Sequence, residues 1–227
     1  MSNLLLTFLN DIIPCQCLLC AASSKQPLCP ACLNALPYWP AHSACPRCAA
    51  LNTQGELCGA CLKNPPAFEQ TFALLLYLSP MAELIQAAKF GGRWALLPPL
   101  AALLAQRITP SVHADFMIAL PLHPARLAER GFNQAQEIAA VLAKRWHIPL
   151  DHHLQRTRNT EHQARLSAKA RLHNVRGAFV YHGDLSGKHI ALVDDVMTSG
   201  ASLNAAAKAL KAAGAAHVQT WVIARTP

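Results

Sequence analysis

The sequence predicts an α/β protein with a mainly parallel sheet flanked by helices, preceded by a small cysteine-rich region. All nine cysteines of the 227-residue chain lie before residue 62. Near the C-terminus, an apolar run, a glycine-containing loop, an alanine-rich segment and a second apolar run follow one another, which is typical of a βαβ unit. Hydrophobic residues make up 52% of the chain and charged residues 14%. This composition excludes a long disordered chain.

The N-terminal segment, residues 1–14, is predicted to form a short amphipathic helix. It lacks the basic region and the small-residue cleavage site of a signal peptide. The longest apolar runs, such as Phe72 to Leu78, are far shorter than the roughly 20 residues that a membrane span needs. We therefore expect a cytoplasmic protein that does not span the membrane.

Eight of the nine cysteines form four C-x-x-C pairs, and each such turn can place two thiolates on one metal ion. In a reducing cytosol this pattern favours zinc over disulfides, a redox pair or an iron–sulfur cluster. Sequential pairing closes shorter loops than a cross-braced arrangement, so we favour it. It predicts two structural zinc sites, formed by Cys17, Cys20, Cys29 and Cys32 and by Cys45, Cys48, Cys58 and Cys61. Cys15 is left over, either as a spare thiol or as a competitor of Cys17.

Composition changes near residues 62–71, where the cysteines end and Asn64-Pro65-Pro66 interrupts the chain. We predict a zinc-binding region over residues 1–66 and a second domain over residues 67–227. Three acids and three bases precede residue 71, whereas nine acids and seventeen bases follow it. A basic stretch in the second part either attracts phosphates and nucleic-acid backbones or forms a solvated face. Its members are Arg156, Arg158, Arg165, Lys169, Arg171 and Arg176.

The C-terminal part is predicted to run as strand, acidic loop, helix and strand, over residues 189–193, 194–202, 203–213 and 217–224. Gly200 permits close backbone approach, and the amides and hydroxyls around it suit a phosphate dianion. The adjacent acids Asp194 and Asp195 suit sugar hydroxyls or a metal–sugar group. A ligand such as ribose 5-phosphate fits both halves; the alternative is a pair of acids that only caps the helix.

Earlier in the chain, residues 115–120 predict a strand, and residues 133–146 predict a helix that Asn133 caps. Apolar residues at helical spacing over residues 80–108 predict helices that pack against the sheet. Arg130 can pair bidentately with phosphate or lie on the surface, and Lys89 can reach a phosphate or extend into solvent.

These motifs together resemble those of the ComF family, the competence-protein-F-like proteins that include the GntX type. VDDVMTSGAS at 193–202 resembles the loop of type I phosphoribosyltransferases that binds 5-phosphoribosyl 1-pyrophosphate (PRPP). LPLHP at 120–124 and ERGFNQ at 129–134 resemble the most distinctive run of the family. Residues 77–92 are similar to its entry segment, and residues 156–179 to its mobile loop.

The resemblance implies a type I phosphoribosyltransferase-like fold that binds PRPP with Mg²⁺, in addition to two structural zinc ions. Asp194 and Asp195 would hold the ribose, Thr198 to Ser202 the 5-phosphate, and Arg156 would join the two acids in catalysis. Mg²⁺ would bind mainly pyrophosphate and ribose oxygens. The implied PRPP-binding residues are Lys89, Leu122, His123, Arg126, Arg130, Asp194, Asp195, Val196, Met197, Thr198, Ser199, Gly200, Ala201 and Ser202.

The resemblance also implies a role in DNA uptake by competent cells or in the use of DNA as a nutrient. Expected partners are PRPP, single-stranded DNA and other DNA-uptake proteins at the inner face of the membrane. One hypothesis is an active phosphoribosyltransferase whose acceptor the sequence does not name. The alternative is a DNA-binding competence factor that uses PRPP as a regulatory ligand without turnover. A zinc scaffold with a relic site is disfavoured, because the acids and the phosphate loop are intact.

Overall fold

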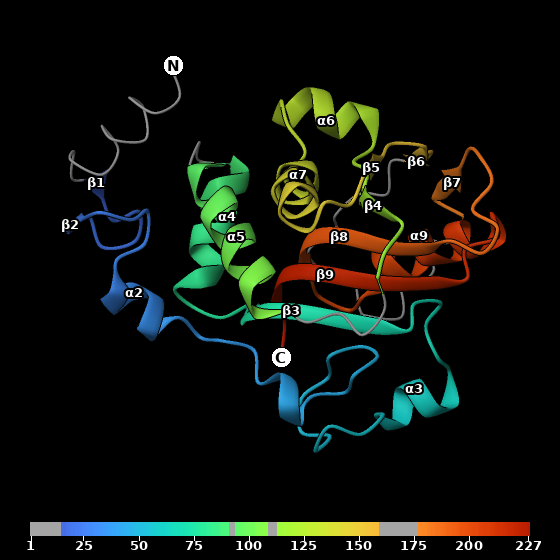
Figure 1. The fold of residues 1–227 in the computed structure, drawn as a ribbon, viewed down its shortest axis with the longest axis horizontal. Coiled ribbons are helices and arrows are strands. Elements are labelled where there is room, and N and C mark those ends of the chain that lie inside the picture. Colours follow the sequence, from blue (N-terminus) through green and yellow to red (C-terminus); the bar gives the residue numbers. More distant parts are fainter. Residues whose placement is uncertain (1–14, 91–93, 109–112, 159–176) are drawn as a thin grey trace. The chain divides into compact units, whose positions relative to one another are not determined.

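The computed structural model describes residues 15–90, 94–108, 113–158 and 177–227 (Figure 1). The predicted helix over residues 1–14 lies outside this range. The chain divides into two compact units, residues 1–37 and 38–227. Contacts thus group the second cysteine cluster with the sheet, whereas composition alone separates the two.

The first unit is small and contains the first cysteine cluster. Its described part comprises the strands β1 (Cys15–Gln16) and β2 (Ser23–Ser24), which pair antiparallel, and the helix α2 (Pro30–Ala35). Cys29 caps α2, since its sulfur accepts a hydrogen bond from the backbone N–H of Cys32 at 3.4 Å.

The second unit is built on a five-stranded sheet. Its strands are β3 (Gln70–Leu76), β4 (Phe116–Ala119), β5 (Leu150–Asp151), β8 (His189–Met197) and β9 (His217–Arg225). They lie in the order β3-β9-β8-β4-β5, and each neighbouring pair is parallel. The central strands β8 and β9 are mostly apolar and largely buried, as expected for strands that helices cover on both faces. This confirms the predicted α/β fold class.

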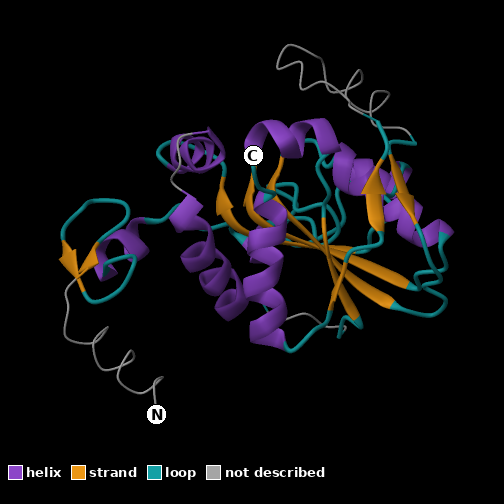
Figure 2. Ribbon diagram, turned by 90° about the horizontal axis from the view of Figure 1, so that it is seen from above, coloured by secondary structure: helices purple, strands orange, loops and turns teal. Residues whose placement is uncertain are grey.

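Helices lie on both sides of this sheet (Figure 2). They are α4 (Met81–Phe90), α5 (Leu97–Arg107), α6 (Pro124–Arg130), α7 (Gln134–Trp146) and α9 (Ala201–Ala212), with the short 3₁₀ helix η2 (Trp94–Leu96) before α5. The helix α7 packs on β8, β4 and α5, while α9 packs on β8 and β9. A hairpin of β6 (Leu154–Arg156) and β7 (Phe179–Tyr181) adjoins α9.

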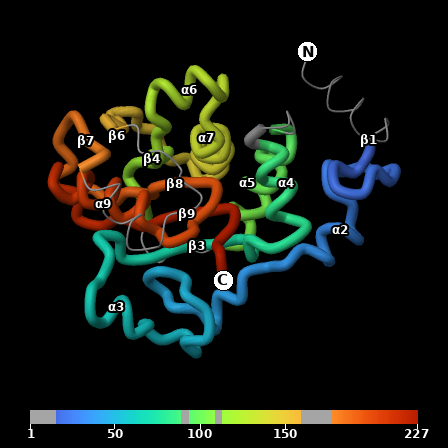
Figure 3. Tube along the Cα trace, turned by 180° about the vertical axis from the view of Figure 1, so that it is seen from behind, coloured from blue at the N-terminus to red at the C-terminus, as the bar shows by residue number. Residues whose placement is uncertain are grey.

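The segment that carries the second cysteine cluster covers the outer edge of β3 (Figure 3). It contains the 3₁₀ helix η1 (Ala41–Ser43) and the helix α3 (Gly59–Lys63). The N–H of Trp39 donates to the carbonyl of Leu74 at 2.9 Å, and the N–H of Thr71 donates to the carbonyl of Pro46 at 3.1 Å. Apolar side chains close this contact, namely Trp39, Ala44, Ala49, Leu51, Ala73 and Leu76. The edge of the sheet is thereby protected from pairing with another chain.

Candidate functional site

The order of the strands reverses between β4 and β8. From β4 the chain continues to its outer neighbour β5, and from β8 it continues to β9 on the other side. Ligands of parallel α/β sheets bind at such a switch point, beyond the carboxyl ends of the strands. Here β4 ends opposite Val193, so that β8 extends further along β9 alone as far as Met197. The loops after β4 and β8 border this edge of the sheet, which we call the shelf.

The end of β8 differs from the sequence-based prediction, in which the acidic loop began at Asp194. Residues 194–197 instead belong to β8, because β9 provides them with a parallel partner up to Arg225. The loop that remains is short, comprising Thr198, Ser199 and Gly200, and α9 begins directly after it. The candidate phosphate loop is thus held tightly between a strand and a helix.

Gly200 makes this tight connection possible. Its φ angle of +73° lies in the left-handed region, where glycine is favoured. A Cβ atom at this position would lie 2.6 Å from Cε of Met197. The N–H of Ala201 donates a hydrogen bond to Oγ of Ser199 at 3.4 Å, while Thr198 and Ser199 are exposed. The 12-residue helix α9 thus presents its first turn beside accessible hydroxyls, an arrangement that suits an anion.

Asp194 and Asp195 point to opposite faces of the sheet, because adjacent residues of a strand alternate. Asp194 is half-buried and Asp195 is buried. One oxygen of each carboxylate accepts a hydrogen bond from the next backbone N–H, at 2.8 Å for Asp194 and 2.7 Å for Asp195. These bonds fix the orientation of both carboxylates at the shelf.

Three arginines share the electrostatic environment of these acids. Burial lowers the pKa of Arg130. The carboxylate of Asp195 is the main charge that opposes this decrease, and the charge of Arg126 adds to it. Burial likewise lowers the pKa of Arg156. The charge of Asp194 opposes this decrease, and the charge of Arg126 adds to it. Both acids and the three arginines that the sequence singled out are thus near enough to one another to interact electrostatically. A cationic group of this kind, set beside two carboxylates, matches a ligand that joins phosphate groups to a sugar.

Two residues of the ERGFNQ run hold this arrangement in place. Nη1 of Arg130 donates to Oε1 of the buried Gln134 at 2.8 Å. The amide of Asn133 caps α7 through the N–H of Ala135 and donates to the carbonyl of Leu120 at 3.1 Å, which ties the helix to the end of β4. Asn133 confirms the predicted cap. The contact between Gln134 and Arg130 was not predicted from the sequence. A polar side chain at a position of the helix that is otherwise apolar was a signal for this contact.

The other predicted residues lie nearby or outside the described range. Nδ1 of His123 accepts a hydrogen bond from the N–H of Ala125 at 3.3 Å and so caps α6, and the adjacent Leu122 is half-buried. The guanidinium of Arg156 lies 5.5 Å from the ring centre of Phe179. The side chain of Lys89 and residues 159–176, which include most of the predicted mobile loop, lie outside the described part.

The cysteines form two clusters, paired sequentially as predicted. In each cluster the four sulfur atoms lie within 4.8 Å of one another; the clusters comprise Cys17, Cys20, Cys29 and Cys32, and Cys45, Cys48, Cys58 and Cys61. Their local geometry repeats, because Cys58 caps α3 in the way that Cys29 caps α2. Four thiolates at this separation fit a tetrahedral zinc ion and leave no open coordination position.

The ionisation of these thiols also fits a cation. Burial opposes the ionisation of Cys17, yet hydrogen bonds from the N–H groups of Cys20 and Cys29 lower its pKa to about 6. In the second cluster, the same balance lowers the pKa of Cys45 to about 7. Hydrogen bonds to Cys20 and Cys29 raise the pKa of Cys32 to about 12. In each cluster one thiol therefore ionises readily, and a bound metal ion would favour the thiolate form of all four.

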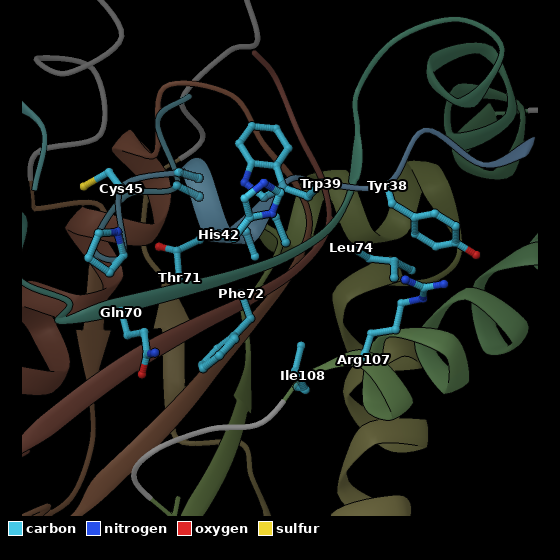
Figure 4. A pocket seen from close by; sticks show the side chains of 15 residues that line it. Tyr38, Trp39, His42, Cys45, Gln70, Thr71, Phe72, Leu74, Arg107 and Ile108 are labelled. Carbon is cyan, nitrogen blue, oxygen red and sulfur yellow. The ribbon is translucent and has the colours of Figure 1, made fainter. Parts of the chain in front are cut away.

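A separate cavity of ≈ 460 Å³ lies between the second cysteine segment and β3 (Figure 4). Its lining includes the aromatic rings of Tyr38, Trp39 and Phe72, and the guanidinium of Arg107 lies 3.6 Å from the centre of the Tyr38 ring. No lining residue belongs to the loop after β8 or to the arginine group. This cavity marks the joint between cysteine segment and sheet.

The fold and the two kinds of site define a protein with a phosphoribosyltransferase domain and a zinc ribbon. A family described as phosphoribosyl transferase domain matches residues 127–227, and one described as double zinc ribbon domain matches residues 8–62. A solved glutamine PRPP amidotransferase from B. subtilis is similar over 57% of this chain and 26% of its own, at 23% identity and a TM-score of 0.40. In the described ranges, no helix has the length and apolar character required to cross a bilayer.

Curated relatives narrow this class to one family. The DNA utilization protein YhgH of Escherichia coli (strain K12) is 35% identical over 190 residues, which cover 80% of this chain and 84% of that protein. Competence protein F of Haemophilus influenzae is 32% identical over 224 residues, which cover 92% and 96%. The chain therefore belongs to the ComF family.

Proposed function

We propose that the second unit binds Mg²⁺-PRPP at the shelf between β4 and β8 and transfers its phosphoribosyl group to an acceptor. The observation that carries this proposal is the meeting of Asp194 and Asp195 with a glycine-bounded anion loop and three arginines at the switch point of the sheet. No acceptor is specified by these residues. A cytosolic location is part of the proposal and is supported by the eight free thiols, which suit a reducing compartment.

Each group has a proposed role. The loop of Thr198 to Gly200 and the first turn of α9 hold the 5-phosphate, where hydroxyls and backbone N–H groups donate to its oxygens. The carboxylates of Asp194 and Asp195 accept hydrogen bonds from the ribose hydroxyls. Arg126, Arg130 and Arg156 face the pyrophosphate, and bidentate pairing suits their guanidinium groups. Val196 and Met197 contribute backbone and packing, while Leu122 and His123 line the loop after β4.

The chemistry is a displacement at C1 of the ribose. The bond between C1 and the pyrophosphate oxygen breaks, pyrophosphate leaves with the electron pair, and an acceptor nucleophile forms the new bond to C1. The carboxylates favour the positive charge that develops on the sugar ring, and the arginines favour the charge on the leaving group. When bound, Mg²⁺ supplies additional neutralisation of the pyrophosphate charge.

Calorimetric titration of zinc-loaded protein with PRPP, with and without Mg²⁺, tests this proposal. We expect micromolar, Mg²⁺-dependent binding that the Asp194→Asn/Asp195→Asn variant loses. The variant Glu83→Gln/Asp184→Asn is the matched control, because it removes two exposed acids from the same unit. Absence of binding by folded wild-type protein would overturn the proposal. A panel of bases and amines, read out as released pyrophosphate, then tests turnover and identifies the acceptor class.

The second candidate function is a DNA-binding factor in which PRPP regulates rather than reacts. It is favoured by the surplus of eight bases after residue 71 and by the names of the relatives, which concern DNA utilization and competence. We propose single-stranded DNA as the macromolecular partner, bound along the basic stretch, and other DNA-uptake proteins as partners at the inner membrane face.

Fluorescence anisotropy with a labelled single-stranded oligonucleotide tests the DNA contact. Neutralising Arg158, Arg165 and Lys169 should weaken binding and flatten its salt dependence, because fewer counterions are released. The control neutralises three bases that are exposed on α7 and α9, namely Lys144, Arg145 and Lys208. If both triple variants weaken DNA binding equally, the loss reflects net charge alone, which would contradict a specific DNA site.

A further inference from the structure

Arg225, the last residue of β9, contacts two segments that are far apart in the sequence. Its Nη1 donates to the carbonyl of Thr198 and, at 3.4 Å, to that of Met197. Its Nε donates to the carbonyl of Cys48 at 3.4 Å, and Nη1 also reaches the carbonyl of Thr226 at 2.6 Å. The side chain thus joins the candidate phosphate loop to the turn between two cysteines of the second cluster.

The backbone of Arg225 is anchored in the sheet. Arg225 pairs with Met197 across β8 and β9, and its carbonyl accepts from the N–H of Tyr77 at 2.8 Å. The N–H of Thr226 donates to the carbonyl of Met197 at 3.0 Å. Because the backbone of Arg225 is fixed, its guanidinium bonds to both carbonyls only when Thr198 and Cys48 lie at matching positions.

The position of the Cys48 carbonyl depends on the second cluster. The turn from Cys45 to Ala50 is closed by hydrogen bonds from the N–H of Cys45 to the carbonyl of Ala50 at 2.7 Å and from the N–H of Ala49 to the carbonyl of Cys45 at 2.8 Å. Ala49 has a φ angle of +53°, which a non-glycine residue rarely adopts. A metal ion that joins both thiolates of the turn stabilises this conformation, because the site and the fold form together.

We propose that Arg225 is a positioning residue that couples zinc in the second cluster to the affinity of the candidate loop for the 5-phosphate. This inference rests on the proposed function and deepens it by assigning a means of regulation to the same site. Zinc fixes the turn that contains Cys48. Arg225, which donates to the Cys48 carbonyl, then fixes the position of the Thr198 carbonyl and with it the conformation of the loop that binds the phosphate. A guanidinium is required because its N–H donors lie on three nitrogens and reach acceptors on two sides at once, whereas the three donors of an ammonium lie on one nitrogen.

The first test measures affinity for two probes, ribose 5-phosphate and inorganic pyrophosphate, by calorimetry on zinc-loaded protein. We expect Arg225→Gln to weaken ribose 5-phosphate binding about tenfold, with pyrophosphate binding and zinc content unchanged. Arg225→Lys should give an intermediate loss. The matched control is Arg107→Gln, which also removes an arginine that contacts the cysteine segment, at Tyr38, but does not contact the loop.

The second test uses the reciprocity of coupled binding. In the wild type, ribose 5-phosphate should raise the chelator concentration needed to remove one of the two zinc equivalents. Arg225→Gln should abolish this shift and Arg107→Gln should retain it. A role of Arg225 in folding alone would not remove the linkage between phosphate and zinc.

The outcomes separate this inference from the proposed function. If wild-type protein binds neither probe, the proposed function fails and the coupling fails with it. If wild-type protein binds both probes and Arg225→Gln retains full affinity and full linkage, only the coupling is overturned. Equal weakening of both probes by Arg225→Gln would indicate a general loosening of the unit and would likewise overturn it.

Discussion

Gly200 constrains the candidate loop through its backbone conformation and through its contact with Met197. It shares its φ angle of +73° with Gly187, so alanine is strained at both positions. Only at Gly200 would the new Cβ meet a side chain, at 2.6 Å from Cε of Met197; at Gly187 nothing lies within 4 Å. We expect Gly200→Ala to lower the free energy of unfolding by about 2 kcal/mol, from backbone strain and overpacking together.

Gly187→Ala is the control for this prediction, since it adds the backbone strain without the contact. Its loss should be about 1 kcal/mol, and urea denaturation of both variants measures the difference. Equal losses would show that Met197 moves aside without cost and that packing does not fix the loop.

At the residue scale, the sequence predicts what a local motif encodes. Asp194, Asp195 and Gly200 stand together in one run, and the eight paired cysteines are spaced for metal. Arg225 was not predicted, because its partner Cys48 is 177 residues away. An arginine at the end of a largely buried strand was the available signal, and it does not identify the partner.

Among the elements, the ends of α7 were more predictable than the end of β8. The predicted helix over residues 133–146 differs from α7 only in that Asn133 is its cap, because capping and apolar spacing are local properties. The strand β8 is longer than predicted, since its last residues pair only with β9. The length of a parallel strand is set by its neighbours, which the sequence does not reveal locally.

The junction of β4 and β8 yields a pH-dependent prediction. The carboxylate of Asp115 accepts from the N–H of His189 at 2.8 Å, and this bond, with nearby positive charge, lowers the pKa of Asp115. Stabilisation by a lowered carboxyl pKa is present above the ordinary value of about 3.9 and is lost as the pH falls through the folded value. Asp115→Asn should therefore cost about 1 kcal/mol at neutral pH and progressively less in acid.

Urea denaturation of wild type and Asp115→Asn between neutral pH and pH values near the ordinary carboxyl pKa checks this sign. The two stability curves should converge as the pH falls. Curves that stay parallel would mean that the ionised form of Asp115 gives no advantage over a neutral amide.

At the scale of the whole second unit, cysteine segment and sheet form one body. Composition places a boundary near residue 66 because the cysteines end there, but hydrogen bonds and apolar packing join residues 38–49 to β3. The amino-acid composition alone does not reveal this packing. The two four-cysteine clusters, by contrast, were predictable in full, because the ligands of each lie close together in the sequence.

Removal of zinc should loosen the outer edge of the sheet first. We expect hydrogen exchange to accelerate at the N–H of Thr71 and of Trp39, which bond across the joint, while the N–H of Met117 in β4 stays protected. Exchange measured with and without a chelator checks this, and re-addition of zinc should restore protection. Uniform loss of protection, including β4, would show that the metal supports the whole unit rather than its edge.

The strand order also determines when the sheet can be completed during synthesis. Within the described five-stranded sheet, β3 (Gln70–Leu76) pairs with β9 (His217–Arg225) alone, although the two strands are far apart in the sequence. A nascent chain therefore carries β3 without its sheet neighbour until β9 has been synthesised. The zinc-bound turn beside β3 is complete much earlier and shields one side of the strand while the ribosome adds the rest. A premature stop that removes β9 would leave β3 without its partner strand in the sheet, and we expect such fragments to aggregate.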